Sequence, residues 1–277
     1  MIWLIPLALL IIVAIVLQQT TGFFVYHLHK FQVDITRDID YGEQPRQQLD
    51  RYLPRHLDSY PVVLFLHGGY WSSGDKRYRQ WLTGLYGSLG VSLARHGIGV
   101  VICNYQLNTG PGSAITIAEL RADATAALQW TKTNTPHSSL TVMGHSAGGH
   151  LAGLLCADQD VDGYIGLSPI LDIPDLFANS SASDNELRYA PVFGADASRW
   201  AEYSVLPQLR ASRASVCILY GGKDYRNIKR QAGAAQRQLP QALVQELPGY
   251  YHRSLVTNLG KRNTLTDIVV RLGAGDH

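Results

Sequence analysis

Cysteine is scarce in this sequence of 277 residues, and its three cysteines are far apart. Cys103, Cys156 and Cys217 each lie in an apolar run, the usual setting of a small buried side chain. An odd number of cysteines at scattered spacing predicts neither a disulfide framework nor a zinc site. His145 and His150 do not form an HExxH pattern either, so we predict no metal.

Charge is also scarce, because Asp, Glu, Lys and Arg together make up 17% of the residues and the net charge is +2. The sequence has no basic stripe with interleaved aromatic residues, so we expect no nucleic-acid partner. Hydrophobic residues make up 46%, a proportion typical of a globular protein with a slight apolar lean. The chain is long enough to bury a large core.

The first part of the chain lacks charge altogether, since no charged side chain precedes Lys30. Residues 2–17 are apolar apart from Pro6, a length that is marginal for a helix that spans a bilayer. We therefore expect residues 1–30 to be an uncleaved anchor that holds the protein on a membrane. The alternatives are a cleaved signal peptide, which would give a secreted or periplasmic protein but normally begins with basic residues, and a buried or interfacial helix.

Beyond residue 31, short β-rich runs alternate with longer helical patterns. The runs 61–66 and 99–103 are continuously apolar, as in strands buried on both faces, and residues 115–133 repeat apolar side chains at helical spacing. This alternation predicts an α/β fold with an open, mostly parallel sheet and helices on both faces. The expected strands are 33–39, 47–52, 61–66, 99–103, 139–143, 164–167, 216–220 and 242–247, and the expected helices are 80–96, 115–133, 226–238, 263–272 and one that follows residue 146.

Residues 169–214 interrupt this regularity. They contain prolines at positions 169, 174, 191 and 207, and the polar stretch 179–184. Long irregular segments inside a folded domain are usually functional. We expect a small inserted cap, or a long functional loop, made of short helices.

One short motif indicates a nucleophile. Gly144-His145-Ser146-Ala147-Gly148 follows the apolar strand that ends at Met143 and opens a helix, which is the context of a GxSxG nucleophile elbow. The turn is so tight that the serine takes a strained backbone conformation, and the two glycines remove side chains that would clash there. The helix N-terminus also favours a developing negative charge. We predict that Ser146 is the nucleophile.

A second motif, His67-Gly68-Gly69-Tyr70-Trp71, comes directly after the strand 61–66. Its glycines expose backbone N–H groups that can point at a tetrahedral intermediate. The N–H of Gly69 or Tyr70, together with that of Ala147, would form an oxyanion hole. We expect His67 to be a structural hydrogen-bonding residue.

An acid and a base are expected to follow the serine in that order. Asp224 lies in the loop after the strand 216–220, at the end of the strand where open α/β sheets place their sites, and His252 follows the next strand. The 28 residues between them leave room for one helix and one strand. Glu246 is a competing acid, but we expect it within a strand, and the terminal His277 is a poor competing base.

Seven features occur in one order along the chain: HGGYW, SGDKRY, CNYQL, Asp123 with Trp130 in RADATAALQW, GHSAGGHLA, GGKD and the His252 loop. Over residues 34–272, this set resembles the esterase/lipase branch of the α/β-hydrolase superfamily that carries an HGG oxyanion motif. The branch includes hormone-sensitive-lipase-like esterases, feruloyl-esterase-like proteins, kynurenine formamidases and isoprenylcysteine methylesterases. The resemblance implies the eight-stranded α/β-hydrolase fold, here over residues 31–277 with a cap-like insertion at 169–214, a Ser-His-Asp triad and no cofactor.

The resemblance also assigns roles and an activity. It implies cleavage of small carboxylic esters through an acyl-enzyme, so the expected partner is a small-molecule ester or amide. The alternatives are an arylformamidase-like amide or formamide hydrolase and a non-catalytic binding protein on the same scaffold. Tyr70 replaces the third glycine of many relatives, and Gln106 stands where relatives often carry arginine; both departures bear on the substrate and leave the triad intact. The implied nucleophile, acid and base are Ser146, Asp224 and His252, and the implied oxyanion donors are Gly68, Gly69, Tyr70 and Ala147.

Overall fold

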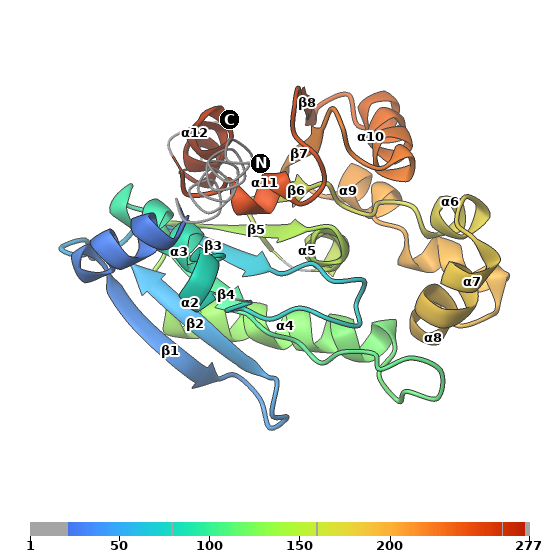
Figure 1. Cartoon of the computed structure of the whole chain (residues 1–277), viewed down its shortest axis with the longest axis horizontal. Helices are drawn as coiled ribbons and strands as arrows, with labels where there is room; N and C mark the ends of the chain where they lie inside the picture. Colours follow the sequence, from blue (N-terminus) through green and yellow to red (C-terminus); the bar gives the residue numbers. More distant parts are fainter. Residues whose placement is uncertain (1–21, 79, 159, 262, 275–277) are drawn as a thin grey trace, which may run out of the picture.

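A single sheet of eight strands forms the centre of the part of the chain that the computed structural model describes, residues 22–78, 80–158, 160–261 and 263–274 (Figure 1). Its strand order is β1-β2-β4-β3-β5-β6-β7-β8, with β2 antiparallel to both neighbours and the remaining pairs parallel. The predicted α/β-hydrolase fold is therefore confirmed. The strands are β1 (Asp34–Asp40), β2 (Gln48–Leu53), β3 (Pro61–Leu66), β4 (Gly99–Cys103), β5 (Ser139–His145), β6 (Gly163–Leu167), β7 (Ser215–Gly221) and β8 (Leu243–Leu247).

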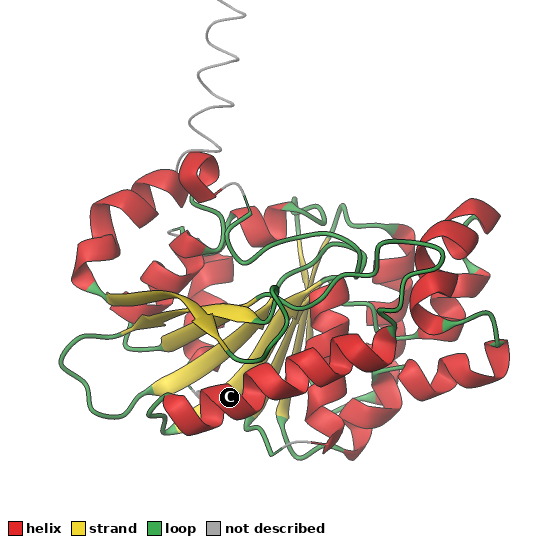
Figure 2. Ribbon diagram, turned by 90° about the horizontal axis from the view of Figure 1, so that it is seen from below, coloured by secondary structure: helices red, strands yellow, loops and turns green. Residues whose placement is uncertain are grey.

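Helices cover both faces of the sheet (Figure 2), which explains why the central strands are apolar on both sides. One face packs against α4 (Ile117–Asn134), α5 (Ala147–Asp158) and α10 (Arg226–Gln238). The other packs against α3 (Gly87–Arg95), the short α11 (Ser254–Thr257) and α12 (Thr264–Gly273). In the strand order β3 lies between β4 and β5, so the loops that follow β3 and β5 meet at one edge of the sheet.

The expected single helix over residues 80–96 is wrong, because the structure divides it into α2 (Gln80–Thr83) and α3. Gly84 separates them with a φ of 70°, a conformation that favours glycine. A Cβ atom at Gly84 would lie 2.2 Å from the carbonyl oxygen of Gly22. The helix is therefore broken where an N-terminal segment packs closely against it.

That N-terminal segment is helical over residues 22–29 and continues into the turn η1 (Lys30–Gln32). Tyr26 is only 3% exposed and belongs to the hydrophobic core beside α3. The folded body therefore includes residues on the N-terminal side of the boundary expected at residue 31. The predicted anchor itself, residues 2–17, lies outside the described residues, and no helix within them is long and apolar enough to cross a bilayer.

The segment between β6 and β7, which we call the cap, consists of a series of short helices. Those nearest the pocket described below gather at one end of the molecule (Figure 1) and share an aromatic core in which the rings of Phe177 and Trp200 stack 3.6 Å apart. The last helix of the insertion packs on α5 instead, through buried Leu206 and Leu209. The helices are α6 (Ile173–Ala178), α7 (Ala182–Asp184), η2 (Asn185–Tyr189), α8 (Ala190–Phe193), η3 (Ala197–Tyr203) and α9 (Leu206–Ala211).

Candidate active site

A pocket of about 250 Å³ opens at the C-terminal edge of the sheet, under the cap. Its base is formed by Ser146 and Ala147 at the end of β5, and His252 forms part of its wall. The loop after β3 contributes Tyr70 and Trp71. The cap contributes a fourth segment to the lining. Four segments that are far apart in the sequence therefore meet in one cavity.

Ser146 occupies a strained turn between β5 and α5. Its φ is 55°, which a non-glycine residue adopts only when its surroundings hold it there. The Ser146 N–H donates to the Leu167 carbonyl (3.0 Å), and its carbonyl accepts from the His150 N–H (3.0 Å). A Cβ atom at Gly148 would lie 2.2 Å from the Leu66 carbonyl oxygen, so the elbow has no room for a larger residue. This is the backbone geometry expected of a nucleophile elbow, and the largely buried Ser146 lines the pocket at the start of α5.

His252 and Asp224 form a hydrogen-bonded pair. Nδ1 of His252 donates to Oδ1 of Asp224 (2.9 Å), which leaves Nε2 free to accept a proton from a neighbouring hydroxyl. Burial alone would raise the pKa of Asp224, but the His252 hydrogen bond and charge hold it below its ordinary value. Asp224 therefore stays ionised and can stabilise a positively charged imidazole.

Two further residues, which the sequence did not indicate, hold this pair. The buried Ser168 donates its hydroxyl to Oδ2 of Asp224 and has a φ of 46°. His145, next to Ser146, shares a hydrogen bond of 3.0 Å between its Nε2 and the His252 carbonyl oxygen. Burial lowers the pKa of His145 to about 3, so the ring is neutral and Nε2–H is the donor. The turn that carries Ser146 and the loop that carries His252 are thus joined directly.

The four predicted oxyanion residues do not play equal parts. Tyr70 and Ala147 line the pocket, whereas Gly68 and Gly69 are not among the residues that do so. Neither the Tyr70 N–H nor the Ala147 N–H donates a hydrogen bond to another described residue, so both are available. Gly69, at φ 135°, makes the turn in which its carbonyl accepts from the Ser73 N–H (2.9 Å). Gly68 and Gly69 therefore shape the loop that presents Tyr70.

The remaining parts of the HGG region are structural. His67 is buried, stacks on Tyr105 (4.3 Å between ring centres) and pairs its Nδ1 with the Gly68 carbonyl (2.9 Å), as the sequence suggested. The loop that follows is anchored by the buried Lys76, whose ammonium lies 2.6 Å from Asp38 and 3.2 Å from Asp50. These contacts fix the loop to β1 and β2.

The competing residues lie elsewhere. Glu246 lies on β8, as expected, and its carboxylate is 3.7 Å from the Lys229 ammonium. The carboxylate that bonds the His252 imidazole is that of Asp224. Gln106 uses its backbone N–H to bond Asp123 (2.7 Å) and is not a pocket residue. His277 lies outside the described residues. No group of three His, Cys, Asp or Glu residues suited to a metal ion occurs in the described part of the chain.

The pocket has apolar side chains beside Ser146 and polar ones on the cap. Trp71, Ile170 and Ile228 are buried beside Ser146, whereas Ser181 and Asp184 lie at the cap side. Asp184 pairs with Arg188 (3.1 Å), and the Arg188 guanidinium lies over the Tyr70 ring, 4.9 Å from its centre. The cap is thus in contact with the loop that carries Tyr70.

Comparison with known proteins gives a consistent family assignment. The family model described as BD-FAE matches residues 49–185. Among curated proteins, the chain is 35% identical to isoprenylcysteine alpha-carbonyl methylesterase of Arabidopsis thaliana over 136 residues, 47% of this chain and 29% of that protein. It is 30% identical to kynurenine formamidase of Salmo salar over 120 residues, 43% of this chain and 37% of that protein. The chain thus spans about a third of the length of these relatives.

Solved structures support the same fold. Esterase B from Lactobacillus rhamnosis superposes with a TM-score of 0.70 at 16% identity, covering 88% of this chain and 87% of that one. A thermophilic esterase from Thermogutta terrifontis gives a TM-score of 0.63 at 19% identity, covering 87% and 93%. At these identities the likeness concerns the fold alone.

Proposed function

We propose that this chain, which belongs to the esterase branch of the α/β-hydrolase superfamily, cleaves small carboxylic esters with Ser146, His252 and Asp224 as its triad. One observation carries the proposal. The strained Ser146 and His252 line a single pocket, and Asp224 bonds His252 from behind, although the three residues come from different loops. The family supports a hydrolase of the esterase type, and the bonded His252–Asp224 pair in the same pocket as Ser146 supports the mechanism.

The reaction would proceed by two acyl-transfer steps. Nε2 of His252 takes the hydroxyl proton as Oγ of Ser146 attacks the ester carbonyl, and the imidazolium is stabilised by Asp224. The N–H groups of Tyr70 and Ala147 would donate to the oxyanion, a contribution of roughly 3–4 kcal/mol for a single donor in other hydrolases. His252 then protonates the departing alcohol. Water attacks the acyl-enzyme by the same route and restores Ser146.

A second candidate is cleavage of formamides, because kynurenine formamidases are among the curated relatives. A substrate panel distinguishes the two: short and long p-nitrophenyl esters are compared with N-formylkynurenine. We expect kcat/KM to be highest for a short ester, since the cavity is small. Faster cleavage of N-formylkynurenine would replace the ester proposal with the formamide one, and no turnover of any substrate would refute both.

The N-terminal anchor also remains a proposal. The apolar run at residues 2–17 supports it. The full chain should stay with the membrane fraction after a carbonate wash and keep Met1. A soluble mature form that begins near Phe23 would show instead that the run is a cleaved signal.

A further inference from the structure

Several exposed tyrosines lie on the loops at the pocket edge of the sheet. Ten large hydrophobic side chains are exposed among the described residues, and four of them are the tyrosines Tyr70, Tyr78, Tyr225 and Tyr251, each 39–50% exposed. We call these four the tyrosine rim. Large apolar side chains that are exposed together usually mark an interaction site, so the rim indicates a contact surface.

The rim is continuous with the catalytic residues. Tyr70 and Tyr225 line the pocket, and the Tyr225 ring lies 4.7 Å from the His252 ring. Tyr251 precedes His252 in the chain. Tyr78 lies in the loop that joins the C-terminal end of β3 to α2, so it belongs to the same edge of the sheet. Two of the four rings therefore line the pocket, and the other two lie on loops at the same edge of the sheet.

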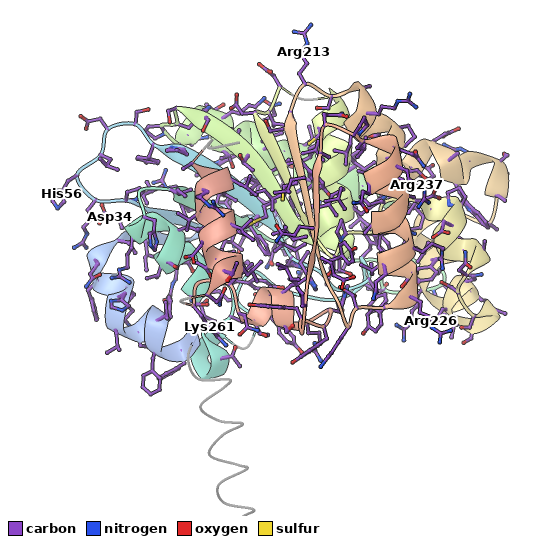
Figure 3. All side chains as sticks on the ribbon, turned by 90° about the horizontal axis from the view of Figure 1, so that it is seen from above. Asp34, His56, Arg213, Arg226, Arg237 and Lys261 are labelled. Atoms are coloured by element: carbon purple, nitrogen blue, oxygen red, sulfur yellow. The ribbon has the colours of Figure 1, made fainter. Side chains whose placement is uncertain are left out.

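Basic residues accompany the rim. Arg188 covers the Tyr70 ring but pairs with Asp184, whereas Arg226 and Arg253 are exposed and form no ion pair with another described residue. Figure 3 places Arg226 and Lys261 on the same edge of the molecule, opposite the edge that bears Arg213. The mouth therefore combines interfacial aromatic rings with positive charge.

The N-terminal segment begins at this same edge. A Cβ atom at Gly22 would lie 3.4 Å from Oγ of Ser88, and that hydroxyl contacts the Leu259 carbonyl, just beyond α11 and the His252 loop. The apolar run 2–17 thus ends only a few residues before the chain reaches the pocket edge.

The helical residues that follow have an apolar outer face. Phe24, Leu28 and Phe31 are exposed at helical spacing, while Tyr26 faces the core. A helix with such an outer face suits the plane of a membrane interface.

We propose that the pocket mouth docks on an anionic lipid bilayer. Tyrosine rings favour the headgroup region, because one end is apolar and the other binds water. Each arginine close to a surface of anionic lipids adds an electrostatic attraction between the protein and the bilayer. The consequence for the substrate, which rests on the esterase function proposed above, is that the enzyme takes amphiphilic esters whose apolar part lies in the bilayer.

Lipid contact is tested without any activity measurement. Cys103, Cys156 and Cys217 are all buried, so a new surface cysteine can be labelled selectively with an environment-sensitive dye. Tyr78→Cys and Tyr251→Cys are compared with Leu243→Cys, an exposed residue on β8. The full chain is reconstituted in phosphatidylcholine vesicles with or without phosphatidylserine, and a headgroup-level lipid quencher is added.

We expect strong quenching at positions 78 and 251 and little at 243, with an increase when phosphatidylserine is present. Equal quenching at all three positions, or none at 78 and 251, would refute the docking surface. Strong quenching that is independent of phosphatidylserine would refute its electrostatic part.

The substrate class is tested with a matched pair on one helix. Arg226 begins α10 at the pocket edge, and Arg237 lies in the last turn of α10, far from it (Figure 3). Arg226→Gln should lower kcat/KM about fivefold for an ester dissolved in phosphatidylserine vesicles, and should leave turnover of p-nitrophenyl acetate unchanged. Arg237→Gln should change neither rate.

If Arg226→Gln and Arg237→Gln change kcat/KM for the vesicle ester equally, the proposal that the substrate comes from the lipid is contradicted. Failure of the unsubstituted enzyme to hydrolyse p-nitrophenyl acetate would refute the proposed function instead, and the quenching result would still decide the docking surface on its own.

Discussion

Ser168 offers the sharpest test of how the triad is supported. Its hydroxyl donates to Oδ2 of Asp224, on the side of the carboxylate away from His252. Ser168 is fully buried, so water cannot replace the hydroxyl if it is removed. We predict that Ser168→Ala lowers kcat/KM for p-nitrophenyl acetate while KM changes little, because the substrate pocket is untouched.

The structure sets the size of this effect. Asp224 would keep the Tyr225 N–H (2.8 Å), the weaker Gly221 N–H (3.3 Å) and the His252 bond. A hydrogen bond to a charged group contributes about 1.5–3 kcal/mol. If this energy serves to hold Asp224 in place for His252, the loss corresponds to a decrease of about 10- to 100-fold in kcat/KM.

Ser168→Gly is the matched control, because Ser168 has a φ of 46°. Both substitutions remove the hydroxyl, but glycine also relieves the left-handed strain, about 1–2 kcal/mol before its extra unfolded-state entropy is counted. We therefore expect both variants to lose the same activity, while Gly is about 1 kcal/mol more stable than Ala in urea unfolding. Wild-type kcat/KM in the alanine variant, or activity that follows stability instead of the hydroxyl, would refute the reasoning.

Three further predictions follow from the site and the core. Ser146→Ala should abolish both ester hydrolysis and labelling by a fluorophosphonate probe, and labelling at the wild-type rate would exclude Ser146 as nucleophile. Asp224→Asn should lower kcat by about 10³–10⁴-fold, whereas Glu246→Gln, which alters only a distant pair with Lys229, should be mild; the reverse order would transfer the acid role. Burial keeps three histidines neutral in the folded protein, so stability should be complete above the unfolded pKa of about 6.5 and fall as pH decreases toward about 4, on the order of 1 kcal/mol per pH unit for each. The three histidines are His67, with its pKa lowered to about 4, His145, to about 3, and His150, to about 4. Urea unfolding at neutral and acidic pH measures this loss of stability, and an unchanged free energy of unfolding would contradict it.

The main site residues could be predicted because they lie in short motifs whose position in a parallel sheet is fixed. Ser146 follows β5, Tyr70 follows β3 and Asp224 follows β7, so the fold alone brings these loops to one edge. His252 follows β8 in the same way. Local sequence and topology were sufficient to predict that these residues lie together, while their catalytic roles stay predictions.

The supporting contacts could not be predicted, since they depend on partners distant in the sequence. Ser168 and Asp224 are 56 residues apart, and His145 and His252 are 107 apart. A serine after β6 has no signature that marks a left-handed φ, which sequence reasoning normally assigns to glycine. His145 occupies the variable position of the GxSxG motif, so the motif itself gave it no role.

The N-terminal boundary shows why an apolar pattern alone can misplace the edge of a domain. Hydrophobic residues resume at Phe23 after the polar stretch 18–21, and no charged residue precedes Lys30, so the sequence does not separate a membrane segment from a packed one. In the structure, Tyr26 faces the core, whereas Leu28 and Phe31 face outward. The inward face stabilises the domain and the outward face remains available to an interface, so the same residues belong both to the folded body and to the surface by which we propose it meets a bilayer.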